Sequence, residues 1–417
     1  MTAGFDAAVA GGGPAGLMAA CFAAESGVRV VVIEKNSVPA KKLRISGKGR
    51  CNLINHCDVL TFLQNVRRGS RFLQSCINSF TAEDIMDFFE TRGLSLVVER
   101  GGRVFPASQS ADDVAETLIE SAKKAGVSFI KGRVTEVLTA DNRVTSIRLG
   151  SGEIIDCKAA VIATGGLSYP KTGSTGDGYR IAKKLSHRIT APHASLVPIE
   201  CSAELSGLQG LSLKNVGLTA EKNGSRVFFG QGEMLFTHYG VSGPLVLTMS
   251  SHLAGENLRD ITAYVDLKPA LSKEELDRRV LRDFSKNLNR DLKNSLDELL
   301  LKKLIPAVIS RSGIDPHKKI NSISSHERAA LVETIKRFLL FMTGFRPIDE
   351  AIVTAGGVEL FEIYPKTMMS KKVENLYFAG EVIDADGFTG GFNLGIAFAT
   401  GAAAGRSIAA KIIGGII

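Results

Sequence analysis

The sequence predicts an α/β protein in which a domain built on a parallel sheet is interrupted by a β-rich insertion. Two apolar stretches, residues 5–10 and 28–34, flank a glycine turn and an alanine-rich segment, which is the order of a β-α-β unit. Residues 193–267 are strand-like, and a glycine-rich pattern returns after Pro347. We therefore expect the first domain to be assembled from two separate parts of the chain.

The glycine turn after the first strand predicts a dinucleotide site. In the pattern Gly11-x-Gly13-x-x-Gly16, the first glycine permits a tight turn, the second lets a pyrophosphate approach, and the third lets the helix pack on the strand. The helix that follows presents free N–H groups to phosphate. Glu34 ends the second strand, where a carboxylate binds ribose hydroxyls.

Two helices and a run of strands follow. Thr81 and Ser110 each precede an amphipathic segment and have an aspartate three residues later, which predicts capping arrangements for both helices. Five short strands are then expected, at residues 127–132, 134–140, 144–149, 153–157 and 159–166. Their close spacing is typical of a β-meander.

The insertion is expected to carry a helical portion. From Ser272 to Leu304, apolar residues recur at three- and four-residue spacing with mixed charges between them, which predicts a solvated helix with one packed face. We place the domains at 1–192, 193–345 and 346–417, with the helical portion at about 270–343.

A long uncharged segment spans residues 387–405 and is followed by Arg406. A stretch of about 20 apolar residues would be long enough to cross a bilayer. This one is rich in Gly, Thr and Asn, so we interpret it as a buried loop and helix and expect no membrane partner.

Composition indicates a globular protein of about two or three domains in its 417 residues. The six cysteines form no C-x-x-C pair and show no zinc-type spacing with histidine, and no signal-peptide pattern is present. We therefore expect free thiols, no metal and a cytoplasmic location.

The net charge is +8, and one stretch, residues 35–50, has six basic residues and no acidic one. These residues are Lys35, Lys41, Lys42, Arg44, Lys48 and Arg50. The hypothesis is that they offset the phosphate charges of the bound dinucleotide. The alternative is a solvated basic loop.

Further motifs decide which dinucleotide is bound. Residues 160–166 read as a strand ending in Ala-Thr-Gly, and residues 375–381 as a strand ending in Ala-Gly-Glu. Both resemble supporting motifs of the FAD domain of the glutathione-reductase type. The resemblance implies non-covalently bound FAD, with Glu381 holding the ribityl chain.

Four longer blocks carry a more specific resemblance. Residues 41–55, 165–182, 235–244 and 379–401 together are similar to the BaiN/RdsA-type NAD(P)/FAD-dependent oxidoreductases, from Phe5 to about Arg406. The family's glycine-rich block usually has Gly or Asn where this chain has Lys48, and its last block has Gln where this chain has Gly395.

This resemblance implies both fold and activity. The expected fold is a Rossmann-like FAD-binding domain of the glutathione-reductase type, interrupted by a β-rich, barrel-like insertion with a small helical subdomain. NAD(P)H would reduce FAD by hydride transfer, and a small organic acceptor, such as an activated C=C bond of a 3-oxo-Δ4 steroid-like compound, would accept the hydride. The chain has no second G-x-G-x-x-G unit, so NAD(P)H is expected to dock only transiently.

The residues expected to contact FAD come from the glycine turn, the basic stretch, the meander and the two late motifs. They are Gly11, Gly13, Pro14, Ala15, Gly16, Glu34, Lys35, Lys42, Gly49, Arg50, Cys51, Asn52, Val134, Thr164, Gly165, Gly380, Glu381, Gly391, Asn393, Leu394, Gly395 and Ile396. A helix beginning near Gly395 would direct its N-terminus at the flavin and stabilise negative charge there.

Three residues are candidates for catalysis. His238 and Tyr169 are possible proton donors, and Cys51 is a possible redox group close to the flavin. Each also has a purely structural interpretation. A redox disulfide between Cys51 and Cys57 is not favoured, because the spacing does not match that motif and the bridge geometry is demanding.

Two other functions fit the sequence. A flavoprotein that modifies tRNA would suit the basic charge, but the helical portion carries both signs and the chain lacks tryptophan, so we expect a small-molecule substrate and no nucleic-acid partner. A flavin-binding sensor or scaffold without turnover would show no reduction by a nicotinamide cofactor.

Overall fold

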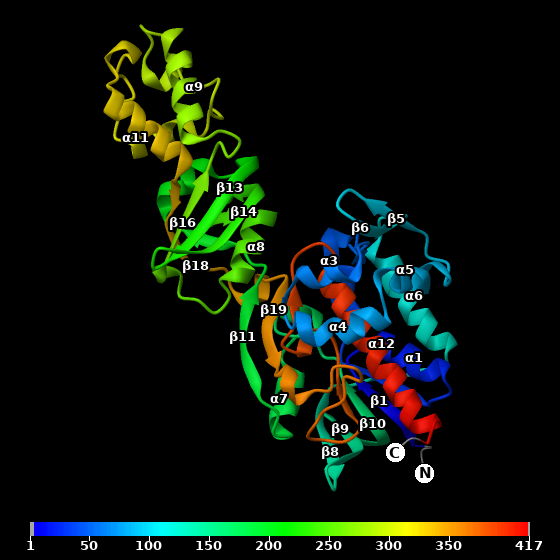
Figure 1. Cartoon of the computed structure of the whole chain (residues 1–417). Coiled ribbons are helices and arrows are strands. Elements are labelled where there is room, and N and C mark those ends of the chain that lie inside the picture. The colour runs from blue at the N-terminus through cyan, green and yellow to red at the C-terminus, as the bar shows by residue number, and fades with distance from the viewer. Residues whose placement is uncertain (1–3, 416–417) are drawn as a thin grey trace. The chain divides into compact units, whose positions relative to one another are not determined.

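The computed structural model describes residues 4–415 and divides the chain into two compact units (Figure 1). Unit 1 comprises residues 4–194 and 348–415, and unit 2 is Ser195–Pro347. The sequence placed these boundaries after residues 192 and 345. Each unit has its own apolar core.

Unit 1 is built on a seven-stranded sheet of order β7-β2-β1-β10-β9-β8, with β20 also paired to β10. The pairs β7–β2, β2–β1, β1–β10 and β10–β20 are parallel. The pairs β10–β9 and β9–β8 are antiparallel. The strands are β1 (Phe5–Ala10), β2 (Val30–Glu34), β7 (Ser128–Lys131), β8 (Val134–Ala140), β9 (Arg143–Leu149), β10 (Ile154–Ile162) and β20 (Leu376–Phe378).

Strand β10 corrects a prediction. The sequence suggested separate strands at 153–157 and 159–166, but β10 is continuous. Residues 154–156 pair with β9 in the antiparallel sense, and residues from Cys157 to Ile162 pair with β1 in the parallel sense. One long strand therefore joins the meander to the parallel sheet.

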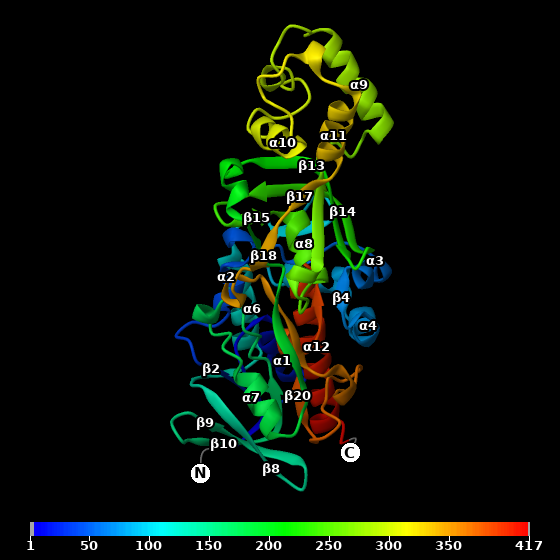
Figure 2. The same ribbon diagram turned by 90° about the vertical axis from the view of Figure 1, so that its left-hand side faces the viewer.

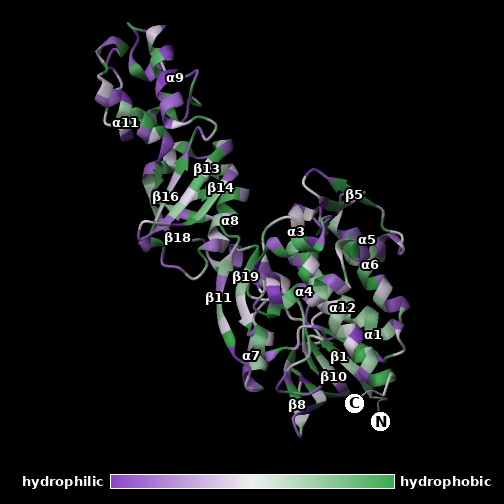
Figure 3. Ribbon diagram, in the orientation of Figure 1, coloured by the Kyte–Doolittle hydropathy of each residue, from purple (hydrophilic) through white to green (hydrophobic). Residues whose placement is uncertain are grey.

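Helices α1 (Pro14–Glu25) and α12 (Phe392–Ile413) pack closely through small residues. A Cβ added at Gly401 would lie 2.3 Å from the carbonyl oxygen of Ala15, and one at Gly405 would lie 2.4 Å from that of Ala19. α12, which is largely apolar (Figure 3), is long and apolar enough to cross a membrane by length and composition. However, 61% of its apolar window is buried. This burial fits a core helix.

Capping at two helices of unit 1 differs from expectation in one case. Thr81 forms a capping box with Asp84 at the start of α5 (Ala82–Glu90). Ser110 precedes α6 (Ala111–Lys124), but its side chain makes no capping hydrogen bond. The prediction for Ser110 is therefore wrong.

The remaining elements of unit 1 surround the sheet. The helices are α2 (Lys41–Arg44), α3 (Val59–Gln64), α4 (Ser70–Ser79) and α7 (Asp177–Lys184). The small strands are β3 (Ile54–Asn55), β4 (Val66–Arg68), β5 (Leu96–Glu99), β6 (Arg103–Pro106), β11 (Ile189–Ser195), β19 (Val353–Val358) and β21 (Asp386–Gly387). β11 pairs with β19 where the chain leaves and re-enters unit 1.

Unit 2 contains an antiparallel sheet of order β17-β16-β13-β14-β15-β12-β18. Its strands are β12 (Ile199–Cys201), β13 (Ser212–Lys222), β14 (Ser225–Phe236), β15 (Gly240–Ser242), β16 (Ile261–Asp266), β17 (Phe338–Leu340) and β18 (Met342–Phe345). β17 and β18 are opposite edges, yet only Phe341 separates them in the chain. The sheet must therefore curl until its edges meet, as a barrel-like insertion requires.

Four helices complete unit 2: α8 (Pro244–His252), α9 (Lys273–Ser285), α10 (Ile305–Ser312) and α11 (Ser325–Lys336). Figure 2 shows α9, α10 and α11 gathered at one end of the sheet. Two predictions are wrong here. α8 interrupts the region read as strands, and the helix expected over 272–304 ends at Ser285, where the Asn287 side chain donates to the Asp283 carbonyl.

Candidate functional site

A cavity of about 580 Å³ lies in unit 1 where the parallel strands end. Its wall includes Ala10 at the end of β1, Glu34 at the end of β2, Ala163 after β10 and Ala379 after β20. The carboxyl edge of a parallel sheet is where α/β proteins bind ligands. The volume falls within the usual range for small-molecule sites, about 300–1,000 Å³.

The three glycines of the turn are needed for three different reasons. Gly11 has a φ of 108°, and a Cβ there would lie 2.5 Å from the Ala163 carbonyl oxygen. A Cβ at Gly16 would lie 2.0 Å from the Gly11 oxygen, so this glycine permits helix packing. Gly13 lines the cavity, and a Cβ there would meet no atom of the described chain within 4 Å. Packing does not explain Gly13, whereas close approach of a ligand does.

Helix α1 begins at the cavity with its N-terminal backbone uncapped. Gly13 is the N-cap, Pro14 occupies the first turn, and no acidic residue lies in that turn. Pro14 and Ala15 both line the cavity. An uncapped helix N-terminus offers N–H groups and partial positive charge, which favours an anion such as a diphosphate.

Glu34 places its carboxylate in the same cavity. One oxygen accepts from the Gly12 backbone N–H at 2.8 Å, and the other accepts from the backbone and side-chain nitrogens of Asn36 at 2.8 and 2.7 Å. These bonds fix the carboxylate beside the glycine turn. It is therefore held where it can accept from ribose hydroxyls.

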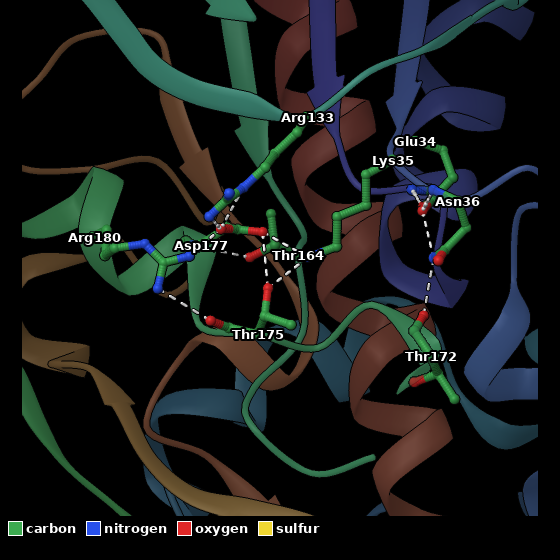
Figure 4. A network of polar contacts seen from close by, with 11 residues as sticks. Glu34, Lys35, Asn36, Arg133, Thr164, Thr172, Thr175, Asp177 and Arg180 are labelled. Carbon is green, nitrogen blue, oxygen red and sulfur yellow. Dashed lines mark hydrogen bonds and ion pairs between the residues drawn. The ribbon is translucent and has the colours of Figure 1, made fainter. Parts of the chain in front are cut away.

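Lys35 belongs to a network centred on Asp177 at the start of α7 (Figure 4). The Lys35 Nζ lies 2.6 Å from Asp177 Oδ2, and Arg133 and Arg180 donate to Oδ1. Burial alone would raise the pKa of this carboxyl, but hydrogen bonds from Lys35 and Arg133 hold it well below its usual range. Lys35 lines the cavity, but its charge is partly offset by Asp177.

Lys42 and Glu381 form a second ion pair on the wall. The Lys42 Nζ lies 2.6 Å from Glu381 Oε2 and 2.6 Å from Ser168 Oγ. Glu381 Oε1 accepts from the Thr354 backbone N–H at 2.8 Å. The motif at residues 375–381 is thereby linked to the basic stretch by an ion pair, and protein groups bind both oxygens of the Glu381 carboxylate.

The hypothesis that the six basic residues offset phosphate charge does not hold for Arg44 and Arg50, which do not line the cavity. Arg44 pairs with Asp112 and Glu116 at 2.7 and 2.6 Å, and Arg50 pairs with Glu99 at 2.5 Å. Lys35 and Lys42 are paired as described above. Within the part of the chain that the structure describes, only Lys41 and Lys48 of the six have no ion pair, and both are exposed on the cavity wall.

The last glycine block starts α12 earlier than expected. The helix begins at Phe392 rather than near Gly395, because Gly391, with a φ of 100°, forms the turn before it. Asn393 lines the cavity and exchanges hydrogen bonds of 2.9 and 2.7 Å with the Gly387 backbone. A Cβ at Gly395 would lie 2.4 Å from Ile54 Cδ1, so this position serves packing and has no room for a long side chain.

Sixteen of the predicted residues line the cavity and eight do not, one of which, His238, belongs to unit 2. The lining residues are Gly11, Gly13, Pro14, Ala15, Glu34, Lys35, Lys42, Val134, Thr164, Gly165, Tyr169, Gly380, Glu381, Asn393, Leu394 and Ile396. Those placed elsewhere in unit 1 are Gly16, Gly49, Arg50, Cys51, Asn52, Gly391 and Gly395. With its side-chain amide turned over, Asn52 donates to the Ile54 carbonyl and accepts from the Gly391 N–H.

The three catalytic candidates have different surroundings. Tyr169 lies on the cavity wall with a φ of 51°, and the Lys42 Nζ is 5.9 Å from its ring centroid. Cys51 is fully buried away from the wall, and burial raises its pKa to about 11. His238 is an exposed residue of unit 2 whose ring contacts Tyr239. All six cysteines, including Cys57, are free.

Sequence reasoning missed several wall residues. Asn36, Arg133 and Asp177 are polar, and Ile352 and Val353 are apolar. Asn36 lies two residues after Glu34, so its place was foreseeable. Arg133 and Asp177 meet across 44 positions of sequence, and no local pattern marks such a pair.

The chemistry of the wall fits FAD. A helix N-terminus and an unfilled glycine position suit the diphosphate, and the fixed Glu34 carboxylate suits the ribose. Apolar side chains such as Leu394 and Ile396 supply a surface for a ring system. Fold and site together define an FAD-binding oxidoreductase of the Rossmann-like class.

Comparison with known proteins identifies the family. The chain belongs to the HI0933-like family, since the model described as HI0933-like protein Rossmann domain matches residues 5–407. This confirms the resemblance to the BaiN/RdsA-type proteins found in the sequence.

Two relatives span almost the whole chain. The ribosomal RNA dihydrouridine synthase of Escherichia coli K12 is 32% identical over 98% of this chain and 99% of its own. The 3-dehydro-bile acid delta(4,6)-reductase of Clostridium scindens is 29% identical over 97% of this chain and 98% of its own. The relatives thus act on different substrates.

Solved structures share the fold at low identity. A flavocytochrome c3 fumarate reductase in an open conformation has a TM-score of 0.52 and 17% identity, covering 97% of this chain and 78% of that one. The 3-ketosteroid delta1-dehydrogenase of Sterolibacterium denitrificans has a TM-score of 0.51 and 15% identity, covering 98% and 99%. These likenesses concern the fold alone.

Proposed function

We propose that this protein is an FAD-dependent reductase that takes hydride from NAD(P)H and reduces a C=C bond conjugated with a carbonyl group. The observation that carries the proposal is that a dihydrouridine synthase and a bile-acid reductase each match almost the whole chain. The uracil ring and a 3-oxo-Δ4 steroid share this conjugated C=C–C=O unit. One reaction type therefore accounts for both relatives.

The residues of this chain would bind FAD and leave its chemistry to the cofactor. FAD, when bound, supplies the hydride chemistry. The N-terminus of α1 and the open position at Gly13 would hold the diphosphate, and Glu34 would hold the adenosine ribose. Lys41 and Lys48, for which the described chain shows no ion pair, would offset negative charge at the cavity wall.

We infer that uridine in ribosomal RNA is the acceptor. Two relatives named ribosomal RNA dihydrouridine synthase, from Escherichia coli and Haemophilus influenzae, are each 32% identical over 96% or more of this chain. The net charge of +8 suits a polyanionic substrate. A cytoplasmic location follows from such a substrate. This inference departs from the expectation, made from the sequence, that nucleic acid is not a partner.

A small 3-oxo-Δ4 compound is the second candidate acceptor. The Clostridium scindens relative, at 29% identity over nearly the whole chain, favours it. It is also the acceptor that the sequence resemblance implied. The two candidates differ sharply in charge and size, so a direct comparison separates them.

The test uses the purified holoprotein under anaerobic conditions. NADPH and then NADH are added while the absorbance of the flavin band at about 450 nm is followed. Fast bleaching by one of them is expected. The bleached protein then receives either unmodified ribosomal RNA or a 3-oxo-Δ4 steroid, and the return of the band is timed.

Each outcome has a definite meaning. Return of the band with RNA but not steroid supports the RNA acceptor, and the reverse supports the second candidate. Failure of both nicotinamides to bleach the flavin contradicts the NAD(P)H-linked reaction and favours a sensor without turnover.

Reduction of the C=C bond also needs a proton at the carbon that does not receive hydride. Tyr169 on the cavity wall is the proposed donor, with His238 of unit 2 as the alternative. We expect Tyr169→Phe to slow the return of the band by about 10²-fold or more while bleaching by NAD(P)H is unchanged. If only His238→Asn slows the return of the band, His238 rather than Tyr169 is the proton donor.

A further inference from the structure

Unit 2 contains a second cavity, of about 820 Å³. It is lined in part by α10, which Figure 2 shows in the helical subdomain. Three segments meet around it: the loop after α9, the residues leading into α10, and the loop after α10. Its lining residues are Arg290, Lys293, Asn294, Asp297, Lys302, Ile305, Pro306, Ile309, Ser310, Pro316 and His317. None of the functions assigned to the first cavity uses this one.

The second cavity is positively charged. Arg290 and Lys302 are exposed and have no ion pair with any residue in 4–415. The Lys293 Nζ lies 3.3 Å from the Nδ1 of His317. Asp297 is the single acidic side chain among the described lining residues, against three basic ones.

Backbone hydrogen bonds hold two of the walls together. The N–H of Leu292 donates to Lys318 at 3.0 Å, that of Lys293 to Pro316 at 3.1 Å, and that of Ile320 to Arg290 at 3.0 Å. The nearby Asp291 is engaged by Lys319 at 2.8 Å. The cations of the wall are therefore presented from a fixed frame, and Asp291, which lies next to Arg290 in the chain, is already paired with Lys319.

The start of α10 adds to the positive potential. Ile305 and Pro306, the first residues of the helix, line the cavity, and the N-cap residue Leu304 provides no side-chain cap. The helix N-terminus therefore directs partial positive charge toward the same space as Arg290 and Lys302. The exposed cations Arg290 and Lys302, the neighbouring Lys293 and the N-terminus of α10 thus all favour an anionic ligand in this cavity.

The exposure of these cations indicates a polyanion rather than a small anion. A single exposed ion pair contributes little, about 0–1 kcal/mol, because water screens it. A nucleic-acid strand differs, because each contacted phosphate releases condensed counterions and the contributions accumulate. An array of exposed, unpaired cations therefore suits a phosphodiester chain.

We propose that this cavity binds the phosphodiester backbone of the RNA substrate. The proposal rests on ribosomal RNA being the acceptor. The described lining residues include no Phe, Tyr or Trp on which a base would stack. The cavity should therefore position RNA through phosphates, without reading its sequence.

The test compares two double variants with the wild-type holoprotein. Arg290→Gln with Lys302→Gln removes two unpaired cations of the cavity. Lys214→Gln with Arg278→Gln removes two exposed cations elsewhere in unit 2, and so changes the net charge equally. Binding of a fluorescein-labelled ribosomal RNA fragment is measured by anisotropy over a series of salt concentrations, with flavin bleaching by NAD(P)H as the check of the intact protein.

We expect the cavity variant to bind RNA about tenfold or more weakly at low salt, and its plot of log K against log salt to be shallower by about 1.5 to 2. In the control variant, both the RNA affinity and the slope of this plot should change far less. Equal slopes for the two variants would overturn the cavity assignment while leaving RNA as substrate. If the wild type binds no RNA, yet its reduced flavin is reoxidised by the steroid, both the RNA acceptor and this assignment fail together.

Discussion

Gly13 and Gly16 belong to one turn, but the first faces a ligand and the second faces protein. We expect Gly13→Ala to lower FAD affinity by about tenfold or more, equal to about 1.4 kcal/mol, since its Cβ would occupy the space of the diphosphate. The unfolding free energy of the apoprotein should change by less than about 1 kcal/mol. FAD titration and urea denaturation of the apoprotein measure the two effects.

Gly16→Ala is the matched control for this prediction. Its Cβ would lie 2.0 Å from the Gly11 oxygen, so it should destabilise the apoprotein itself by about 1–3 kcal/mol or more. If Gly13→Ala were to destabilise the apoprotein as much as Gly16→Ala does, the ligand-facing role of Gly13 would be refuted.

Asp177 predicts a dependence of stability on pH. The folded pKa of this carboxyl lies below its ordinary value of 3.8, so its ion pairs stabilise the fold fully above that pH and progressively less below it. We expect Asp177→Asn to lower the unfolding free energy by about 2 kcal/mol at neutral pH. The difference from wild type should stay constant down to about pH 5 and shrink below about pH 4.

Urea denaturation of both proteins across this pH range is the measurement. Asp156→Asn is a suitable control, because it removes another aspartate of unit 1 for which no ion pair is present in the described chain. A difference that grows in acid would show that Asp177 is not held in its charged form by Lys35 and Arg133.

At the residue scale, the sequence predicted what depends on local spacing and missed what depends on distant partners. The roles of Gly11 and Glu34 follow from their positions around one turn. From the sequence, Arg44 and Arg50 were expected to bind phosphate. In the structure they form ion pairs with acidic residues that lie 49 to 72 positions away in the chain. A charged residue can therefore be counted from the sequence, whereas its neutralisation cannot.

Among the elements, α5 and α6 offer a direct test of helix capping. Thr81 bonds the Asp84 backbone in a capping box, whereas the Ser110 side chain caps nothing. We expect Thr81→Ala to lower the unfolding free energy by about 1 kcal/mol and Ser110→Ala to leave it nearly unchanged. Chemical denaturation of the two variants checks this, and equal losses would contradict it.

The elements also mark where periodicity is informative. The β-α-β unit was predictable because two buried strands and a glycine turn are local signals. The end of α9 was not, because apolar spacing continued past Ser285 while side chains such as Asn287 turned back to the helix backbone. The prediction divided β10 into two strands, whereas the structure has one. This strand changes its pairing partner from β9 to β1 without a break in the chain, and no local signal marks such a change.

For the whole molecule, the two separate cores predict how cofactor binding affects unfolding. The FAD cavity is lined by residues of unit 1. Saturation at 100 times Kd should therefore stabilise unit 1 by about 2.7 kcal/mol and leave the stability of unit 2 unchanged. Hydrogen exchange of the apoprotein and holoprotein resolves this, with protection expected in β1 and α12 but not in β13 and β16.

A uniform gain of protection across both units would contradict this prediction. The same measurement on Gly13→Ala serves as the control, since weaker FAD binding should reduce the protection of β1 and α12 in proportion.

The split of unit 1 between the two ends of the chain governs the order in which the protein is made on the ribosome. β20, which pairs with β10, and α12, which packs on α1, are translated only after all of unit 2. Unit 2 is a continuous segment with its own core and can fold while translation proceeds, at roughly 5–20 residues per second. The nascent N-terminal half must meanwhile wait with the apolar face of α1 uncovered, which makes it a target for chaperones. The cavity of unit 1 is complete only once its last lining residues, up to Ala397, have been translated.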